Sequence, residues 1–226
     1  QTPAKEPCPC GRLGRKHPHQ VSRYFIWPDE PDSRLAELCA FTNSLRDAIE
    51  ASGRAFRFTI ETHLRNMAPD LAKRLRHAGM DMVKVGIETV DQDVLDSAKR
   101  FSMDGDEQRQ RIATLEDMGI KVTCHYIVAM PGESPDTWKT TLRYARRLNT
   151  LFAQISVFTP YPGTPAYAEF EDRVIVDRYE SFTQYDLVFR HENLTPAQVR
   201  RMLSDAYHDY YLRPSWILKY LRTRFA

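Results

Sequence analysis

Polar residues follow several apolar stretches of this sequence, at points where a strand is expected to end. Glu61 and Arg65 follow FRFTI, and Glu88 and Thr89 close MVKVGIET. Two further stretches, KVTCHYIV and FAQISVF, are followed by AMPGES and TPYPGTP. Carboxylates accept hydrogen bonds from ligand amines and hydroxyls, and Pro-Gly turns expose backbone N–H and C=O groups. The pattern predicts a site that holds a flat ligand partly through backbone contacts.

Each of these motifs also has a purely structural interpretation. Glu88 and Thr89 can cap a helix that begins near Asp91, and AMPGES can be an ordinary turn with Ser134 as the next helix cap. His125 lies within an apolar strand, which favours a core histidine with satisfied hydrogen bonds. One such motif proves little. Four of them in order, each at a strand end, favour a ligand site.

Two cysteines stand one residue apart near the start, in EPCPCGRLGRKHPH. Four-coordinate metal sites usually draw on C-x-x-C pairs, and the thiols of Cys8 and Cys10 alone cannot complete one. Cys39 and Cys124 lie in apolar patterns, where a free cysteine behaves as a small hydrophobe. We therefore expect a solvated loop at Cys8 and Cys10, and no metal site.

The composition excludes several classes of protein. With 226 residues and 42% hydrophobic residues, the chain can bury a core. A net charge of +2 carries no nucleic-acid or membrane signature, so no nucleic-acid partner is expected. Four unevenly spaced cysteines and the lack of a secretory segment favour a cytoplasmic protein. Residues 1–22 show no periodic pattern and are interpreted as a linker or the remnant of a truncated unit.

Residues 23–165 alternate short apolar runs with amphipathic helical stretches, as a parallel sheet covered by helices does. Gly79 and Gly119 are expected to end two of the helices, and Pro69 and Pro135 to begin two. The predicted strands are RYFIW, FRFTI, MVKVGI, KVTCHYIV and FAQISVF. About five strand-helix units in series favour an α/β barrel, open or closed, over a doubly wound sheet. No G-x-G-x-x-G or P-loop follows any strand.

Residues 166–226 differ in character and are predicted to form a C-terminal aromatic and helical extension. Thr195 and Pro196 open one helix, and Pro214 separates it from SWILKYLRTRF. The second helix can touch a membrane surface, but a helix with one face docked on the core explains the same pattern. Membrane contact is left open.

The ordered motifs resemble a known family. MVKVGIETVDQDVLDSAKR and the segment from GIKVTCHYIVAMPGES to TPYPGTPAYAEF are similar to the core of radical S-adenosylmethionine (SAM) enzymes, most of all to members with an upstream cobalamin-binding domain. The tail from YDLVFRHENL to SWILKYL resembles the C-terminal region of that group. The likeness covers residues 24–221. It implies a partial (β/α)6 TIM-like barrel that lacks its first strand-helix unit.

The resemblance also implies an activity. A 4Fe-4S cluster and SAM would support reductive cleavage of SAM to a 5′-deoxyadenosyl radical, and cobalamin-dependent methyl transfer to an unactivated carbon is the favoured reaction. A small-molecule or lipid-like substrate and a reducing partner such as a flavodoxin or ferredoxin are implied as well. The alternative is a degenerate barrel that serves as a non-catalytic SAM-binding or partner-binding module. A metal-independent barrel enzyme is a third possibility, but no acid-base pair is evident.

Site residues follow from the same resemblance, while no catalytic residue is assigned. Glu88 and Thr89 match the carboxylate motif near the amino-acid and ribose portions of SAM. The turn that flanks adenine matches Ala129, Met130, Pro131 and Gly132, with Glu133 supporting it and Gly132 letting the backbone approach the ligand. The next turn matches Thr159, Tyr161 and Pro162, and the polar positions after the family's third strand match Glu61 and Arg65.

One departure from the family concerns the cluster. The family binds three irons through C-x-x-x-C-x-x-C, and this sequence contains no such motif. The cluster ligands are therefore expected upstream of Gln1, or the chain is a degenerate member. The cobalamin loop D-x-H-x-x-G is likewise not in the sequence. We expect that the chain by itself does not hold a stable cluster, which anaerobic reconstitution with iron counting tests.

Overall fold

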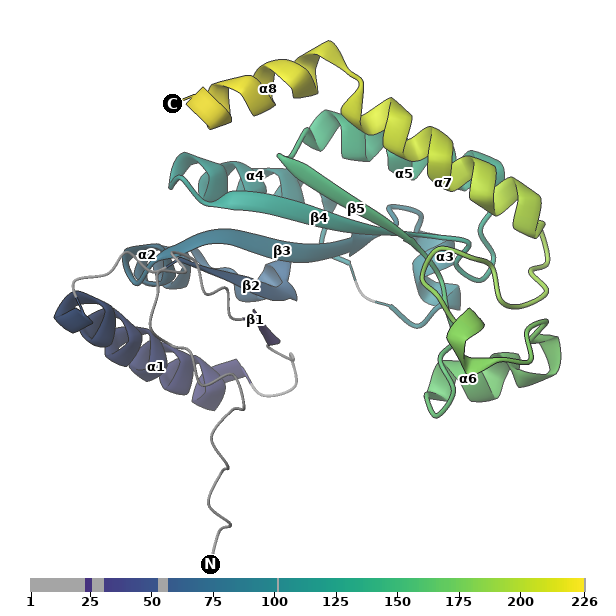
Figure 1. Ribbon diagram of the computed structural model, residues 1–226, viewed down its shortest axis with the longest axis horizontal. Helices are drawn as coiled ribbons and strands as arrows, with labels where there is room; N and C mark the ends of the chain where they lie inside the picture. Colours follow the sequence, from purple (N-terminus) through teal and green to yellow (C-terminus); the bar gives the residue numbers. More distant parts are fainter. Residues whose placement is uncertain (1–22, 26–30, 53–56, 101, 226) are drawn as a thin grey trace, which may run out of the picture.

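Five parallel strands form one sheet in the computed structural model, which describes residues 23–25, 31–52, 57–100 and 102–225. The strands are β1 (Arg23–Phe25), β2 (Phe58–His63), β3 (Met80–Glu88), β4 (Lys121–Val128) and β5 (Phe152–Val157). Their order in the sheet is their order in the sequence (Figure 1). Successive units of a βα barrel follow that order, whereas a doubly wound sheet reverses its direction of growth. The five predicted strands are confirmed, and the doubly wound alternative is wrong for the described residues.

Helices connect consecutive strands. They are α1 (Pro31–Ser52), η1 (Leu64–Asn66), α2 (Pro69–His77), α3 (Gln92–Ser97), α4 (Gly105–Asp117) and α5 (Pro135–Leu148). Pro69 and Pro135 occupy first-turn positions, and Ser134 forms a capping box with Thr137. Gly79 ends the α2 segment at a φ of 110°. The local signals in the sequence thus set the helix boundaries.

The two faces of the sheet differ in polarity. Side chains alternate along each strand, and one set is fully buried against α2, α4 and α5: Val83, Val85, Ile87, Val122, Cys124, Tyr126, Ala153 and Ile155. The other set is only half-buried and includes Glu61, Lys84, His125 and Gln154. In Figure 1, α4 and α5 lie above the sheet, while α1 and α6 lie at its two lower ends. We call the half-buried face the inner face of the sheet.

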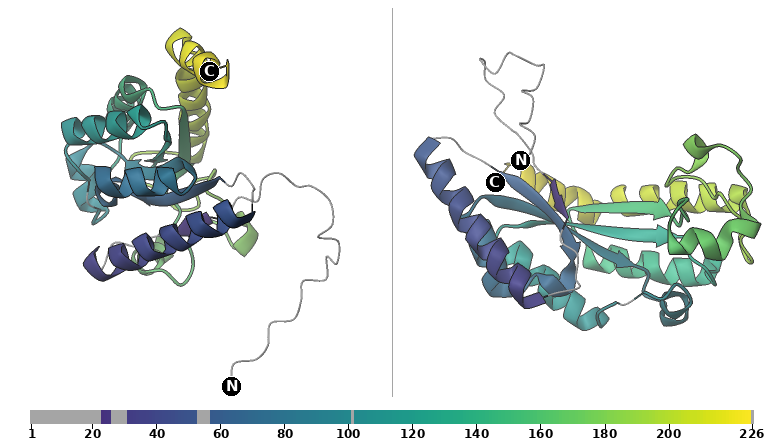
Figure 2. Two further views of the ribbon diagram at one scale, coloured as in Figure 1. Left: turned by 90° about the vertical axis from the view of Figure 1, so that its left-hand side faces the viewer. Right: turned by 90° about the horizontal axis from the view of Figure 1, so that it is seen from below.

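The C-terminal extension contains α6 (Pro165–Phe170), η2 (Glu171–Arg173), η3 (Tyr179–Ser181), α7 (Pro196–Tyr211) and α8 (Pro214–Phe225). Helix α7 runs beside β5 (Figure 2). The Tyr207 hydroxyl donates to the Ile155 carbonyl at 2.9 Å and accepts from the Ile155 N–H at 3.1 Å. The Tyr211 hydroxyl does the same for Ala153, at 2.7 and 2.8 Å. Two tyrosines one helical turn apart therefore form hydrogen bonds with the backbone N–H and C=O groups on the outer edge of β5. Another strand would otherwise pair with these groups.

Helix α8 is attached more loosely. The Trp216 indole donates to the Leu151 carbonyl at 2.8 Å, and the Lys219 ammonium contacts Glu116 Oε1 at 2.6 Å. Ile217 and Leu218, by contrast, are exposed. Among the helices that the structure describes, none combines the length and apolarity needed to cross a membrane.

Candidate functional site

The carboxyl ends of the strands bring most of the predicted site residues to one edge of the sheet. In the strand register Glu61 pairs with Lys84, Glu88 with Tyr126, and Val128 with Val157. Glu88, the 129–132 turn and Thr159 thus share the edge at which βα barrels place their active sites. Glu61 does not follow its strand as expected: it lies within β2, level with Lys84 in the middle of β3. Arg65 lies on η1 and is exposed, and Tyr161 and Pro162 are exposed in the turn after β5.

Glu88 ends β3 in a left-handed conformation, with a φ of 65°. Its Oε1 lies 3.3 Å from Arg100 Nη1, and its buried Oε2 has no hydrogen-bond partner in the described part of the chain. Burial raises the pKa of Glu88, and Arg100 partly offsets that rise. The helix cap of α3 is Asp91, whose carboxylate accepts from the Val94 N–H at 3.1 Å. Glu88 is therefore not needed as a cap.

Thr89 is used within the fold. Its side chain is fully buried, and its hydroxyl lies 2.9 Å from the Thr141 hydroxyl of α5. It also accepts from the Asp91 N–H at 3.3 Å. Thr89 thus joins the end of β3 to α5, which holds the main chain of Glu88 in place.

The turn after β4 is built around a buried carboxyl group. Ala129 and Gly132 both have left-handed φ angles, of 61° and 82°. The Ala129 N–H donates to Glu133 Oε2 at 2.5 Å, and the Glu133 N–H donates to the Met130 carbonyl at 2.9 Å. Glu133 is fully buried, and burial raises its pKa to about 8. The sequence-based expectation that Glu133 supports this turn agrees with that geometry.

A segment of the C-terminal extension holds the same turn from outside. His191 Nε2 lies 2.9 Å from the Met130 carbonyl oxygen, and the Gly132 N–H donates to Glu192 Oε1 at 2.5 Å. The Asn193 amide donates to the Gly132 carbonyl at 3.3 Å. We call residues 191–193 the clamp segment. Sequence reasoning missed it, because a contact across 60 residues leaves no local pattern; the polar run HEN before the Thr195 cap is the only signal.

The reason for a glycine at position 132 differs from the expected one. A Cβ there would lie 3.5 Å from Ser97 Oγ and 3.8 Å from Ser97 Cβ, in ordinary contact with α3. The left-handed φ of 82° is what favours glycine. The expectation that the position leaves space for a ligand is therefore corrected.

The turn after β5 is also held by its own hydrogen bonds. The Thr159 hydroxyl is 3.0 Å from the carbonyl oxygens of both Val157 and Thr183. Thr164 caps α6 by accepting from the Tyr167 N–H at 3.2 Å. These contacts shape the turn, and its exposed face carries Tyr161 and Pro162.

On the inner face, His125 was misjudged from the sequence. Its ring is half-buried and stands beside Glu61, with 3.8 Å between Nδ1 and Glu61 Oε1. Nε2 has no hydrogen-bond partner within the described residues, so His125 is not the satisfied core histidine that the strand pattern favoured. Burial lowers the pKa of His125, Glu61 opposes this effect, and Lys84 adds to it.

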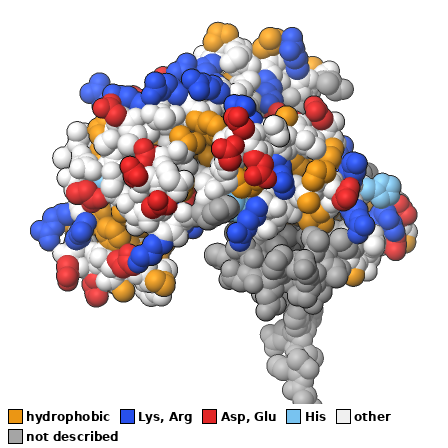
Figure 3. Space-filling view, turned by 180° about the vertical axis from the view of Figure 1, so that it is seen from behind, with side chains coloured by type: hydrophobic (Ala, Val, Ile, Leu, Met, Phe, Trp, Pro, Cys, Tyr) orange, Lys and Arg blue, Asp and Glu red, His pale blue; other side chains and the backbone are white. Residues whose placement is uncertain are grey.

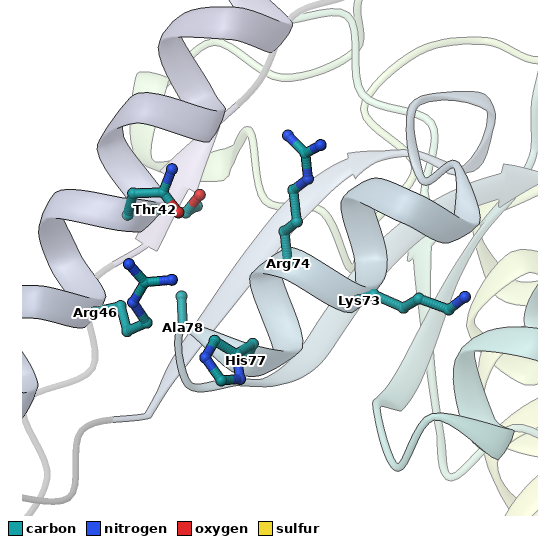
Figure 4. A pocket seen from close by; sticks show the side chains of 7 residues that line it. Thr42, Arg46, Lys73, Arg74, His77 and Ala78 are labelled. Carbon is teal, nitrogen blue, oxygen red and sulfur yellow. The ribbon is translucent and has the colours of Figure 1, made fainter.

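A pocket of about 220 Å³ lies between α1 and α2 (Figure 4). Its lining is basic and polar: Thr42, Asn43, Arg46, Lys73, Arg74, His77 and Ala78. Because α2 ends where β3 begins, this pocket lies at the opposite end of the sheet from Glu88. Basic side chains also gather along the upper edge in Figure 3, where α5 and α7 lie. Arg143, Arg146 and Arg147 are exposed on α5.

Metal ligands are not found among the described residues, which contain no group of three or more His, Cys, Asp or Glu side chains suited to an ion. Cys8 and Cys10 lie outside these residues, as does the predicted linker of residues 1–22. Cys124 is buried, and burial raises its pKa to about 12. It behaves as the small hydrophobe that was expected.

Curated relatives match most of the chain at low identity. The uncharacterized methyltransferase PH0819 of Pyrococcus horikoshii is 24% identical over 173 residues, covering 76% of this chain and 38% of its own length. The anaerobic magnesium-protoporphyrin IX monomethyl ester cyclase of Cereibacter sphaeroides is 25% identical over 202 residues, or 86% and 32% of the two chains. The chain thus spans about a third of the length of these relatives.

Solved structures share the fold. The methyltransferase TsrM from Kitasatospora setae, a radical SAM protein with cobalamin and a [4Fe-4S] cluster bound, superposes with a TM-score of 0.61 at 16% identity, covering 85% of this chain and 43% of TsrM. The Escherichia coli coproporphyrinogen III oxidase HemN gives 0.56 at 16% identity, covering 79% and 37%. The family model of the radical SAM superfamily matches residues 16–145, more than half of the chain. The chain therefore belongs to the radical SAM superfamily.

Proposed function

We propose that this chain is part of a radical SAM enzyme that binds SAM at the carboxyl ends of β3, β4 and β5. One observation carries the proposal. The buried Oε2 of Glu88 has no partner among the described residues, although it lies at the edge where βα barrels bind their ligands. The ammonium group or a ribose hydroxyl of SAM would supply the hydrogen-bond donor that this oxygen lacks.

The remaining residues fit the same ligand. The Ala129–Gly132 backbone is fixed by Glu133 and by the clamp segment, so the turn is rigid before any ligand arrives. Thr89 fixes the main chain at Glu88 through Thr141. A pre-organised site loses less entropy on binding than a mobile one. In this arrangement Glu88 binds the ligand, and Thr89 and Glu133 hold the backbone that positions it.

One-electron reduction of bound SAM would break its S–C5′ bond, release methionine and supply a 5′-deoxyadenosyl radical for hydrogen abstraction from a substrate. The chain's own part is to orient SAM and to keep water away from it. Val128 and Met130 are fully buried beside the turn and pack it against the protein interior. The described residues offer no ligand set for a 4Fe-4S cluster, so we assign no step of cluster chemistry to them.

We further propose cobalamin-dependent methyl transfer to an unactivated carbon as the reaction of the whole enzyme. The support is the methyltransferase PH0819 among the relatives and the cobalamin-containing TsrM among the fold neighbours. A cyclase is also among the relatives, so a rearrangement of the substrate is the competing reaction. An electron donor such as a flavodoxin or ferredoxin is required in either case, and we place the enzyme in the cytoplasm.

SAM binding with Glu88→Gln tests the proposal. We expect about tenfold weaker SAM affinity by titration calorimetry, because the neutral amide loses the charge-assisted hydrogen bond. The free energy of unfolding should change by less than about 0.5 kcal/mol, since the contact of the Glu88 side chain with the fold is an ion pair with the half-exposed Arg100.

Glu107→Gln is the matched control. Glu107 is also a glutamate paired with an arginine, at 3.0 Å from Arg111, but it lies on the exposed face of α4. This variant should bind SAM like the unchanged chain. If the chain shows no SAM binding, or if Glu88→Gln loses stability and keeps its SAM affinity, the proposal is wrong.

A further inference from the structure

A small gap on the inner face separates Glu88 from His125. Gly86 lies between them in β3, where it pairs with His63 on one side and His125 on the other. A Cβ at Gly86 would meet only the Glu88 side chain, with Cγ and Oε1 both 3.9 Å away. The inner face is therefore open at Gly86, with the Glu88 carboxylate above it and the imidazole of His125 beside it.

Two polar atoms that flank this gap are unsatisfied. Glu88 Oε2 and His125 Nε2 are buried atoms with no hydrogen-bond partner in the part of the chain that the structure describes. Unsatisfied buried polar atoms are rare in native proteins, and one explanation for them is a missing ligand. The proposed SAM site explains the unpaired oxygen of Glu88. His125 pairs with Gly86, two residues before Glu88 in β3, and the proposed SAM site does not explain its unpaired Nε2.

Glu61 determines which ring nitrogen of His125 carries the proton. Its carboxylate faces Nδ1 at 3.8 Å, on the far side of the ring from Nε2. A carboxylate beside Nδ1 favours the tautomer that carries its proton on Nδ1. Burial and Lys84 both favour the neutral imidazole over the charged one. Nε2 then presents a lone pair, so the missing group is a hydrogen-bond donor.

We propose that His125, positioned by Glu61, binds an N–H or O–H group of the substrate in the layer below Glu88. The inference rests on the proposed function, because it takes the ligand below the SAM site to be the substrate. It narrows the substrate class to molecules with a donor group near the reacting carbon. It also argues against a purely hydrocarbon substrate at this level of the sheet, where Glu61, Lys84 and Gln154 are the half-buried neighbours.

The tautomer of His125 gives the first test. Nitrogen-15 NMR of the histidine-labelled chain reports which ring nitrogen carries the proton, and the spectrum of His125→Gln assigns the signal among the seven histidines. We expect a proton on Nδ1 and none on Nε2 at neutral pH. Glu61→Gln should weaken this preference, and the exposed Glu107→Gln should leave it unchanged. A proton on Nε2 in the unchanged chain overturns the proposal.

A matched pair of probes gives the second test. Indole carries a ring N–H, and benzofuran has the same shape with an acceptor oxygen in its place. We expect indole at millimolar concentration to shift the His125 Nε2 signal at least fivefold more than benzofuran does. Equal shifts, or no shift with either probe, overturn the proposal.

A SAM titration of the same sample separates this inference from the proposed function. If SAM shifts the amide signals of Gly86 and Thr89 while indole leaves Nε2 unchanged, only the inference about His125 fails. If SAM causes no shift at these amides, the proposed SAM site itself fails.

Discussion

Two glutamates follow adjacent strands and differ in what they hold. Glu133 accepts the Ala129 N–H and so closes the turn after β4, whereas the partner of Glu88 among the described residues is the half-exposed guanidinium of Arg100. Burial raises the pKa of both, and each keeps one buried oxygen without a partner among the described residues. A carboxyl group with a raised pKa is therefore not by itself a ligand site. What distinguishes Glu133 from Glu88 is its hydrogen bond to the backbone of the turn.

The backbone makes the two turns look alike. Glu88 and Ala129 are both left-handed residues that end a strand, with φ angles of 65° and 61°. Such residues are strained unless their surroundings hold them. At Ala129 the holding group is the carboxyl group of Glu133, and at Glu88 it is the neighbouring hydroxyl pair of Thr89 and Thr141. Apart from its ion pair with Arg100, the Glu88 carboxylate is thereby left without a structural task in the described part of the chain.

Removal of the Glu133 carboxyl group should have the largest effect on stability. Glu133→Ala leaves the Ala129 N–H without its acceptor inside the protein, and the expected loss is about 2–3 kcal/mol of unfolding free energy. Glu88→Gln should lose less than about 0.5 kcal/mol. Urea unfolding followed by circular dichroism measures both. Equal losses at the two positions would erase the difference between the two glutamates.

The pH dependence of stability should carry the signature of Glu133. Its folded-state pKa is raised to about 8 from 4.5, mainly by burial and in small part by Asp91. The unfolded chain therefore releases this proton first, and stability falls as the pH rises from about 4.5 to about 8. The slope from one group is at most about 1.4 kcal/mol per pH unit. Glu133→Gln should flatten this part of the curve, and a variant curve parallel to the original would contradict the assignment.

Backbone strain gives a smaller effect at Gly132. Gly132→Val places a β-branched residue at a φ of 82° and should cost about 1–2 kcal/mol. Asn tolerates left-handed geometry, so Gly132→Asn should cost a few tenths of a kcal/mol. In both variants the Cβ atom would point toward Ser97 and away from the proposed SAM site, so Gly132→Asn should keep its SAM affinity. A tenfold loss of affinity in Gly132→Asn would restore the original expectation that the position leaves space for a ligand.

Local patterns in the sequence predicted the five strands and most of the helix boundaries. Period-two alternation marks Val83, Val85 and Ile87 as one face of β3, and prolines and glycines mark where helices begin and end. The edge that collects Glu88 and the 129–132 turn follows from strand ends in a parallel sheet, whereas Glu61 lies within β2. Local rules of this kind suffice because each involves residues that are neighbours in the chain.

Three features could not be predicted from local patterns. Tyr207 and Tyr211 look like two members of an amphipathic helix, and only the structure shows that their hydroxyls satisfy the β5 backbone. The sequence predicts a core position for His125, because the alternation of apolar and polar residues along β4 does not show which face of the sheet the helices cover. The structure places His125 on the inner face, with Nε2 unpaired among the described residues. The clamp segment pairs residues 60 positions apart. In all three the partner is distant in sequence, so its identity depends on the assembled fold.

A mainly local effect is expected at the clamp segment, where Glu192 fixes the Gly132 N–H from outside. Glu192 also pairs with Arg173 at 3.3 Å on the half-exposed surface, so Glu192→Ala should lose no more than about 1 kcal/mol of stability. The local effect should be clearer, because the Gly132 amide loses its acceptor and should exchange with deuterium several-fold faster. Glu192→Gln is the matched control, since its amide oxygen can still accept the hydrogen bond without the charge. Fast exchange of the Gly132 amide in Glu192→Ala and slow exchange in Glu192→Gln would show that the hydrogen bond, and not the ion pair with Arg173, holds the turn. If Gly132 exchanges at the same rate in all three chains, Glu192 has no part in holding the turn, which is then held by Glu133, His191 and Asn193.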